Sequence, residues 1–314
     1  MKRYLAYLTG VVLLLFLILA PTILPSYYLG LVILALIWGI FAMSLDILTG
    51  YTGLPSFGHA AFFGVAAYAA GILQARMFNN FWPLMTAALF AAAFVSALFG
   101  LLVMRSRGVY FLMITLALSM VLWGLASNWQ GLTGGHDGLS GVSRPDLAPL
   151  PWSLAETGNY YYFVLIVFVI AAVLMHFIVR SPFGVALLGI RESETRMSVL
   201  GYNVWLYKYV SFIVTGIIAG LAGILFAYYN GFVHPGVLGI GTSAKVLIMT
   251  ILGGPGTLFG PLGGAAIIVF LENLMSAYSE RWQMFLGAVY IIVVIFAPRG
   301  IYGPIGKLIR RAMR

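Results

Sequence analysis

Long apolar runs recur along the whole chain, and each is close to the length of a membrane-spanning helix. Ten such runs lie at 4–24, 28–48, 56–75, 82–104, 109–128, 160–179, 208–230, 243–258, 261–277 and 282–297. About 20 apolar residues in a helix cross a hydrocarbon core of about 30 Å. Only 8% of the residues are charged, too few to cover a soluble domain of this size. We therefore predict an all-α polytopic integral membrane protein, a single transmembrane domain over 1–314 with about 8–10 transmembrane helices.

The basic residues predict the orientation of these helices. We expect the run at 4–24 to be an uncleaved first span, because it is longer than a signal-peptide core and no small-x-small cleavage site follows it. With the N-terminus inside, the inner segments collect Lys2, Arg3, Arg105, Arg107, Arg180, Arg191, Arg196, Lys208, Arg299, Lys307, Arg310, Arg311 and Arg314, and the outer ones Arg76, Arg144 and Arg281. Cytoplasmic segments of membrane proteins carry such an excess. Both termini are predicted to be cytoplasmic, and the net charge of +9 marks topology rather than a nucleic-acid partner.

Glycine and proline interrupt two of the apolar regions. The sequences GYTGLPSFGHAAFFG at 50–64 and GFVHPGVLGIGTSAKVLIMTILGGPGTLFGPLGG at 231–264 would break a helix at membrane depth. Broken backbone there is tolerated only inside protein or beside a wet cavity. One such region in each half is the pattern of transporters built from internal repeats. The runs at 56–75 and 243–258 are therefore expected either to span or to re-enter.

The segment GIRESETRMSVLGYNVW, at 189–205, concentrates charge between two apolar runs. Wound as one helix over about 190–200, it forms an apolar stripe of Ile190, Ser193, Met197 and Leu200. Glu192 and Arg196 would pair one turn apart, and Gly201 would end the helix in the left-handed conformation. So short a helix must dock on something, either lipid headgroups or a cytoplasmic partner.

Five sequence stretches resemble one family and occur in its order. They are GYTGLPSFGHAAFFGVAAYAAG (50–71), TGGHDGLSGV (133–142), RSPFGVALLGIRESETRMSVLGYNVWLYKYVSFIVTGIIAGLAGILFAYY (180–229), ILGGPGTLFGPLGGA (251–265) and FAPRGIYG (296–303). Together they resemble the permeases of branched-chain amino-acid ABC transporters, M-type subunit, from about residue 30 onward. The resemblance implies an ABC importer permease fold in a bacterial cytoplasmic (inner) membrane. In that membrane, the charge distribution predicts 129–158 as a periplasmic loop, 180–207 as a cytoplasmic loop and 298–314 as a basic cytoplasmic tail.

The resemblance also implies partners and a mechanism. The helix at about 190–200 would be the coupling helix that docks on an ATPase subunit, in a loose form of the family's loop. The residues expected to serve the coupling are Arg191, Glu192, Glu194, Arg196, Met197, Leu200 and Gly201. A sister permease, two ATPase subunits carrying ATP and Mg, a periplasmic solute-binding protein and membrane lipid complete the expected assembly. Alternating access would translocate branched-chain amino acids, with other amino acids, urea-like amides and small aromatic acids as alternative solutes.

Polar groups at membrane depth are candidates for the translocation path, because they are costly there. Asp46 and Lys245 stand where the resemblance implies Asn and an acidic residue, so we hypothesise that they pair across the pore; the alternative is that each reaches its nearest interface separately. Ser56 and His59 would stand at an exposed helix start that attracts a carboxylate, or would only satisfy broken backbone. Glu272 is expected to pair with Arg281, whereas His136 and Asp137 could meet a solute-binding protein.

The sequence lacks the motifs of an enzyme or a motor. GPIGK at 303–307 has no Ser or Thr after its lysine, so it is not a phosphate-binding loop, and GLSGV at 138–142 is not a nucleophile elbow. There is no cysteine, and the four histidines show no metal-ligand spacing. We predict no catalytic residue, no metal and no cofactor on this chain. A self-sufficient secondary transporter or channel remains a rival class, and a structural membrane subunit a weaker one.

Overall fold

The computed structural model describes residues 17–76, 80–147 and 153–278, with isolated residues at 284, 287–288, 291 and 300. Within them, six helices are long and apolar enough to cross a membrane. The prediction of an all-α polytopic membrane protein is confirmed. Most of the expected first span and nearly all of the expected last span lie outside the described residues.

The described elements follow one another in this order: α2 (Ser26–Asp46), the π-helix η1 (Ile47–Tyr51), α3 (His59–Arg76), α4 (Phe81–Val103), α5 (Val109–Asn128), α6 (Gln130–Thr133), η2 (Gly135–Asp137), β1 (Leu139–Ser140), α7 (Thr157–Arg180), α8 (Pro182–Glu192), α9 (Glu194–Val199), α10 (Val204–Asn230), β2 (Phe232–Val233), η3 (Pro235–Leu238), α11 (Ile240–Gly253) and α12 (Gly260–Tyr278).

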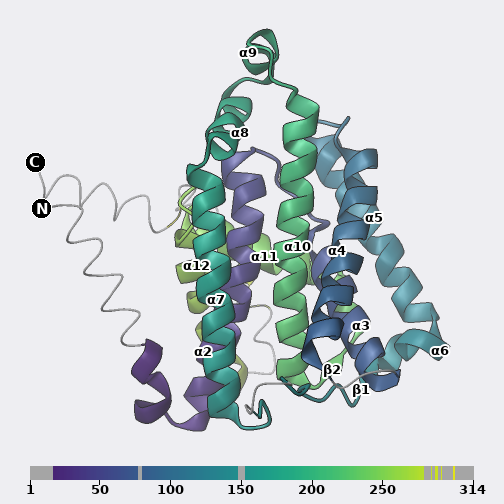
Figure 1. The fold of residues 1–314 in the computed structure, drawn as a ribbon, viewed down its shortest axis with the longest axis vertical. Helices are drawn as coiled ribbons and strands as arrows, with labels where there is room; N and C mark the ends of the chain where they lie inside the picture. The colour runs from purple at the N-terminus through teal and green to yellow at the C-terminus, as the bar shows by residue number, and fades with distance from the viewer. Residues whose placement is uncertain are drawn as a thin grey trace, which may run out of the picture.

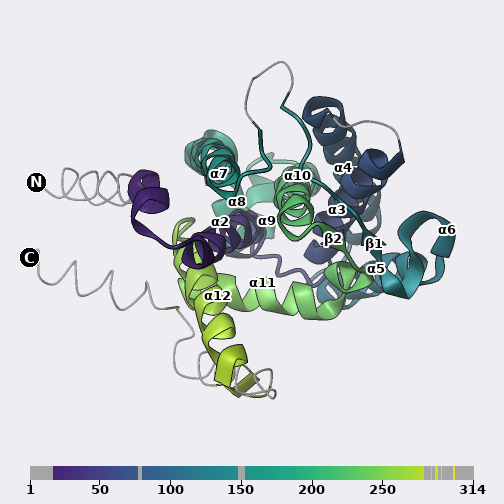
Figure 2. The same ribbon diagram turned by 90° about the horizontal axis from the view of Figure 1, so that it is seen from below.

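Helices α2 and α10 form the centre of the bundle, and the remaining long helices surround them (Figures 1 and 2). Small residues let α10 approach its neighbours closely, as is common between membrane helices. Gly216, Gly220 and Gly223 fall on one face of α10, and a Cβ added at Gly220 or Gly223 would collide with Ala92 of α4 or with the backbone of Phe63 in α3. The glycine-rich sequence of α10 therefore fixes the tight packing of the core.

The two regions broken by glycine and proline form shortened elements. Helix α3 begins only at His59, after a non-helical stretch at 52–58. Helix α11 has 14 residues, about 21 Å at 1.5 Å per residue, which is less than a full crossing. It follows η3, whose Leu238 carbonyl accepts a hydrogen bond from Ser119 in the interior of α5 (2.7 Å). Within the described residues, α11 is accordingly not among the six helices long enough to cross a membrane, and it lies across the bundle in the view of Figure 2.

The two large loops lie at opposite ends of the bundle (Figure 1). One end carries α8 and α9, and we call it the α9 end. The other carries α6, η2 and a two-stranded antiparallel sheet in which Leu139 of β1 faces Val233 of β2, and we call it the sheet end. His136 and Asp137 are exposed there, in η2. Their contact with a binding protein stays a prediction.

Candidate functional site

The charged segment forms an elbow of two short helices, α8 and α9, rather than one. We call residues 182–203 the elbow. The backbone at Ser193 is extended (φ −163°, ψ 104°), and its Oγ accepts a hydrogen bond from the N–H of Arg196 (3.3 Å). The prediction of one continuous helix over 190–200 is therefore wrong. Serine satisfies an N-terminal N–H more readily than it continues a helix, and this local preference interrupts the apolar period.

Only part of the predicted apolar stripe packs against protein. Ile190 and Met197 are buried together with Ala186, and they close the elbow onto the start of α10. Leu200 instead faces outward with 70% of its surface exposed, next to Val199 with 84%. The elbow thus has an anchored inner face and an apolar tip.

The predicted end of the helix at Gly201 is confirmed. Its φ of +88° is left-handed, a conformation that glycine adopts without steric cost. The N–H of Gly201 bonds to the carbonyl of Ser198 (3.0 Å), and the N–H of Tyr202 bonds to that of Met197 (3.1 Å). This pair of bonds is a Schellman motif, which satisfies carbonyls at the end of the helix.

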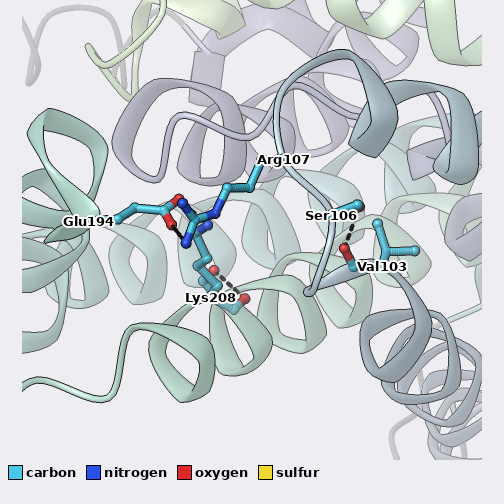
Figure 3. A network of polar contacts seen from close by, with 6 residues as sticks. Val103, Ser106, Arg107, Glu194 and Lys208 are labelled. Atoms are coloured by element: carbon cyan, nitrogen blue, oxygen red, sulfur yellow. Dashed lines mark hydrogen bonds and ion pairs between the residues drawn. The ribbon is translucent and has the colours of Figure 1, made fainter. Parts of the chain in front are cut away.

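An ion-pair network fastens α9 to two other parts of the chain (Figure 3). Glu194 pairs through Oε1 with Lys208 of α10 and through Oε2 with Arg107 of the α4–α5 loop (3.3 Å). The predicted pair of Glu192 and Arg196 is absent from the ion pairs of the described ranges, because the break at Ser193 removes the helical spacing between them. In the sequence, Lys208 and Arg107 were predicted only to be among the basic residues of the inner segments. No local pattern around either residue indicated a contact with Glu194.

A second contact ties the elbow to the end of α2. The guanidinium of Arg191, in α8, donates through Nη1 to the carbonyl of Gly50 in the π-helix η1. A Cβ on Gly50 would overlap the backbone of Gly256, so only glycine allows the α11–α12 loop to approach so closely. The contact was not predicted, because no sequence pattern relates the two positions.

Asp46 fastens the same α11–α12 loop. Its Oδ1 accepts the N–H of Gly256 (2.6 Å) and its Oδ2 accepts the N–H of Leu258 (2.9 Å). Leu258 has a positive φ of 59°, which is unfavourable for a leucine and is held here by surrounding structure. The hypothesis that Asp46 pairs with Lys245 is therefore wrong. The buried carboxyl group finds its partners in backbone N–H groups instead.

Lys245 has a different partner from the one predicted. Its ammonium pairs with Glu272 of α12 and lies over the ring of Trp38, 4.4 Å from the ring centroid. Glu272 was expected to pair with Arg281, which lies outside the described residues. The acid that meets Lys245 comes from α12 rather than α2, because α12 packs against both α11 and α2.

The helix start at Ser56 and His59 is closed by protein. Both side chains are fully buried. Ser56 Oγ accepts from the N–H of Gly58 (3.1 Å), and Ser243 Oγ accepts from the N–H of Ala60 (3.3 Å). His59 contacts a serine hydroxyl, Ser44 Oγ, through Nε2 (3.1 Å). The expectation of an exposed helix start that attracts a carboxylate is wrong for this conformation.

The chain is also similar in sequence to known proteins. The sequence model of the family described as branched-chain amino acid transport system / permease component matches residues 27–295. Over 289 residues the chain is 29% identical to the high-affinity branched-chain amino acid transport system permease protein LivM of Escherichia coli (strain K12), covering 85% of this chain and 68% of that protein.

Two further relatives extend the comparison. The chain is 24% identical to the high-affinity branched-chain amino acid transport system permease protein LivH of Salmonella typhimurium (strain LT2), covering 85% of this chain and 91% of the relative. It is 29% identical over 247 residues to the ribose import permease protein RbsC of Escherichia coli (strain K12), covering 73% and 72%. No solved structure matches significantly.

Proposed function

Because this chain belongs to the family of branched-chain amino acid transport permeases, as its motifs predict, we propose that it is a permease subunit of an ATP-driven importer. Separate ATPase subunits bind ATP and Mg, a second permease completes the pore, and a periplasmic binding protein delivers the solute. The chain itself performs no covalent chemistry. Alternating access, driven by the ATPases, exposes the path to one side of the membrane and then to the other.

The apolar tip of the elbow is the observation that carries this proposal. Helix α9 stands beyond the ends of the long helices (Figure 1), and its tip exposes Val199 and Leu200 there. Large apolar side chains on a protruding tip suit a groove on another protein. A helix that lies on lipid headgroups needs a long apolar face in the membrane plane. Helix α9 has only six residues, and its Met197 is buried against α8, so this side chain cannot contribute to such a face.

The charges support a cytoplasmic position for this tip. Six basic residues of the described ranges lie at the α9 end: Arg105, Arg107, Arg180, Arg191, Arg196 and Lys208. Arg76 and Arg144 lie at the sheet end. The α9 end is therefore assigned to the cytoplasm of a bacterial inner membrane, where the ATPases are.

Each predicted coupling residue receives a role from its contacts. Leu200 contacts the ATPase subunit, and Gly201 ends α9 so that Leu200 is exposed at the tip. Met197 seats α9 on α8, whereas Glu194 and Arg191 transmit its displacement to the spans. Glu192 and Arg196 are exposed on the elbow and form ion pairs with charged residues of the ATPase subunit.

The family suggests which solute is transported, and the burial of the candidate residues indicates which side of the bundle the path follows. Branched-chain amino acids are the first choice, but one relative is named for ribose, so the scaffold alone does not fix the solute. Among the four candidates for the path, Asp46, Ser56 and His59 are buried within the chain. Lys245 alone of these reaches a partly exposed surface, and the path is assigned to its side of the bundle.

A self-sufficient secondary transporter is not favoured. Ion coupling in such a transporter would use the charged residues at membrane depth, Asp46, Lys245 and Glu272. Asp46 is instead bound to two backbone N–H groups, and Lys245 and Glu272 are paired with each other. Uptake that continues in vesicles without ATP would reverse this preference.

Cysteine trapping tests the proposed docking, and the absence of native cysteine makes single replacements clean. A Val199→Cys chain should form a disulfide with a cysteine placed in the groove of the cognate ATPase, and the yield should change with bound ATP. A Ser140→Cys chain, changed at the sheet end, is the matched control and should not cross-link. Equal cross-linking of the two variants, or none at Val199→Cys in an active importer, would overturn the proposal.

A further inference from the structure

Lys245 and Glu272 form an ion pair in the interior turns of α11 and α12. The ammonium rests on Trp38, which lies near the middle of α2. Both charged side chains stay partly exposed, Lys245 at 20% and Glu272 at 25%. Charges at such depth in a membrane protein almost always face a protein partner or a water-filled cavity rather than lipid. The open side of this pair is therefore a polar surface inside the assembled transporter.

The face of α11 that carries Lys245 differs from its packed face. Ser243, Val246 and Thr250 are buried against the bundle, whereas Lys245 and Ile248 are on the partly exposed side. The partly exposed side thus presents one cation and an apolar side chain one helical turn away. The neighbouring acid on α12 completes a surface with a positive pole, a negative pole and an apolar edge.

We propose that the Lys245–Glu272 pair is a contact site for a zwitterionic amino acid on the translocation path. The α-carboxylate of the solute meets Lys245 and its α-ammonium meets Glu272, while its side chain lies toward Ile248. The inference rests on the proposed function and names the part of the chain that recognises the solute class.

Charge balance favours a zwitterion at this pair. The ammonium of lysine has three donors, and the carboxylate of glutamate accepts at both oxygens, so each group can hold its partner and a ligand at once. A zwitterion adds one charge of each sign and leaves the net charge of the site unchanged. A singly charged ligand adds a net charge to the site, in a setting where charge without a counter-charge is costly. A sugar or an amide gains little from either pole.

Aqueous access to this face is the first test, in the complete importer reconstituted in liposomes. An Ile248→Cys variant keeps the ion pair intact and should react with a charged, membrane-impermeant methanethiosulfonate, as read from the mass of this chain. Phe90→Cys, on an exposed position of α4, is the matched lipid-facing control and should not react. Failure of Ile248→Cys to react, or equal reaction of both variants, would overturn the proposal.

Protection of the same thiol tests the ligand class. L-leucine at about ten times its Kd should slow the labelling of the Ile248→Cys variant by about tenfold, because the thiol reacts only while the site is unoccupied. Isocaproate and isoamylamine keep the carbon skeleton of leucine with one charge each, and each should protect far less. Equal protection by all three compounds, or none by leucine, contradicts a zwitterion site.

Transport by a variant in which both members of the ion pair are replaced by uncharged residues tests the proposed site separately from the proposed function. The double variant Lys245→Met with Glu272→Gln removes both poles without leaving an unpaired charge, and its leucine uptake should fall by about tenfold. Co-purification with the partner subunits verifies that it assembles, and Glu156→Gln, on an exposed loop residue, is the matched control. Uptake of the double variant within about twofold of the unmodified chain overturns the site alone. Absence of ATP-dependent uptake by the unmodified chain would instead overturn the proposed function.

Discussion

The ion pair that anchors α9 is unequally buried, and this asymmetry predicts unequal effects of removing its two members. The side chain of Lys208 is 4% exposed, whereas that of Glu194 is 26% exposed. Glu194 also has a second cation, Arg107, within 3.3 Å. Replacing Glu194 with glutamine leaves a buried ammonium without an anion. Replacing Lys208 with methionine leaves a carboxylate that still has Arg107 and water.

The magnitudes follow from these environments. Breaking a buried pair by removing one partner costs about 3–5 kcal/mol, and the partial exposure of Glu194 lowers this to about 2–3 kcal/mol for Glu194→Gln. For Lys208→Met we expect about 0.5 kcal/mol, the scale of an exposed ion pair, because Arg107 remains. The double variant should resemble Lys208→Met, since it leaves no buried charge.

Hydrogen exchange of the backbone amides at 194–200 measures the effect where it arises. Local opening free energies set these exchange rates, so Glu194→Gln should accelerate them by about 30- to 150-fold, and Lys208→Met by about twofold. Arg107→Ala, at an exposed partner, is the control and should change them by no more than about twofold. Exchange accelerated as much by Lys208→Met as by Glu194→Gln, or additive effects in the double variant, would show that unequal burial does not govern the pair.

Two further predictions concern the contact between the end of α2 with η1 and the α11–α12 loop. Both are measured by thermal unfolding of the purified chain in detergent. Gly50→Ala should destabilise it by about 3 kcal/mol, because the added Cβ overlaps the backbone of Gly256, whereas Gly124→Ala, with open space in α5, should be neutral or slightly stabilising. Asp46→Ala should cost about 2–4 kcal/mol by leaving the N–H groups of Gly256 and Leu258 unpaired, and Asp46→Asn, which keeps one accepting oxygen, about half as much. A larger loss for Gly124→Ala than for Gly50→Ala, or equal losses for the two Asp46 variants, would contradict these expectations.

The long spans were predictable because apolar length is itself the physical requirement for crossing a membrane. The run expected at 82–104 is α4 at Phe81–Val103, and that expected at 109–128 is α5 at Val109–Asn128. Glycine and proline likewise marked where α3 and α11 depart from simple spans. They did not reveal the path of the chain there, because a broken helix has many possible continuations.

The partners of the polar residues were not predictable from the sequence. The cost of a buried charge requires a partner for Lys245, but an acid on α2 and an acid on α12 satisfy that requirement equally well. Only the packing of α11 against α12 selects Glu272. The wrong prediction of one continuous helix through Ser193 has a different cause. The apolar period favoured continuing the helix there, whereas the serine side chain favoured starting a new one. A local side-chain hydrogen bond decided the outcome.

The break at Ser193 has a mechanical consequence for the proposed coupling. Arg191 lies before the break and holds η1, whereas Glu194 lies after it and holds α10. A push on the tip of the elbow therefore acts on α2 and on α10 through separate contacts, and a bend at Ser193 changes the distance between them. Asp46 passes any displacement of η1 into the loop before α12, the helix that carries Glu272. One continuous helix would move both contacts together, so the broken elbow is better suited to moving these spans relative to each other.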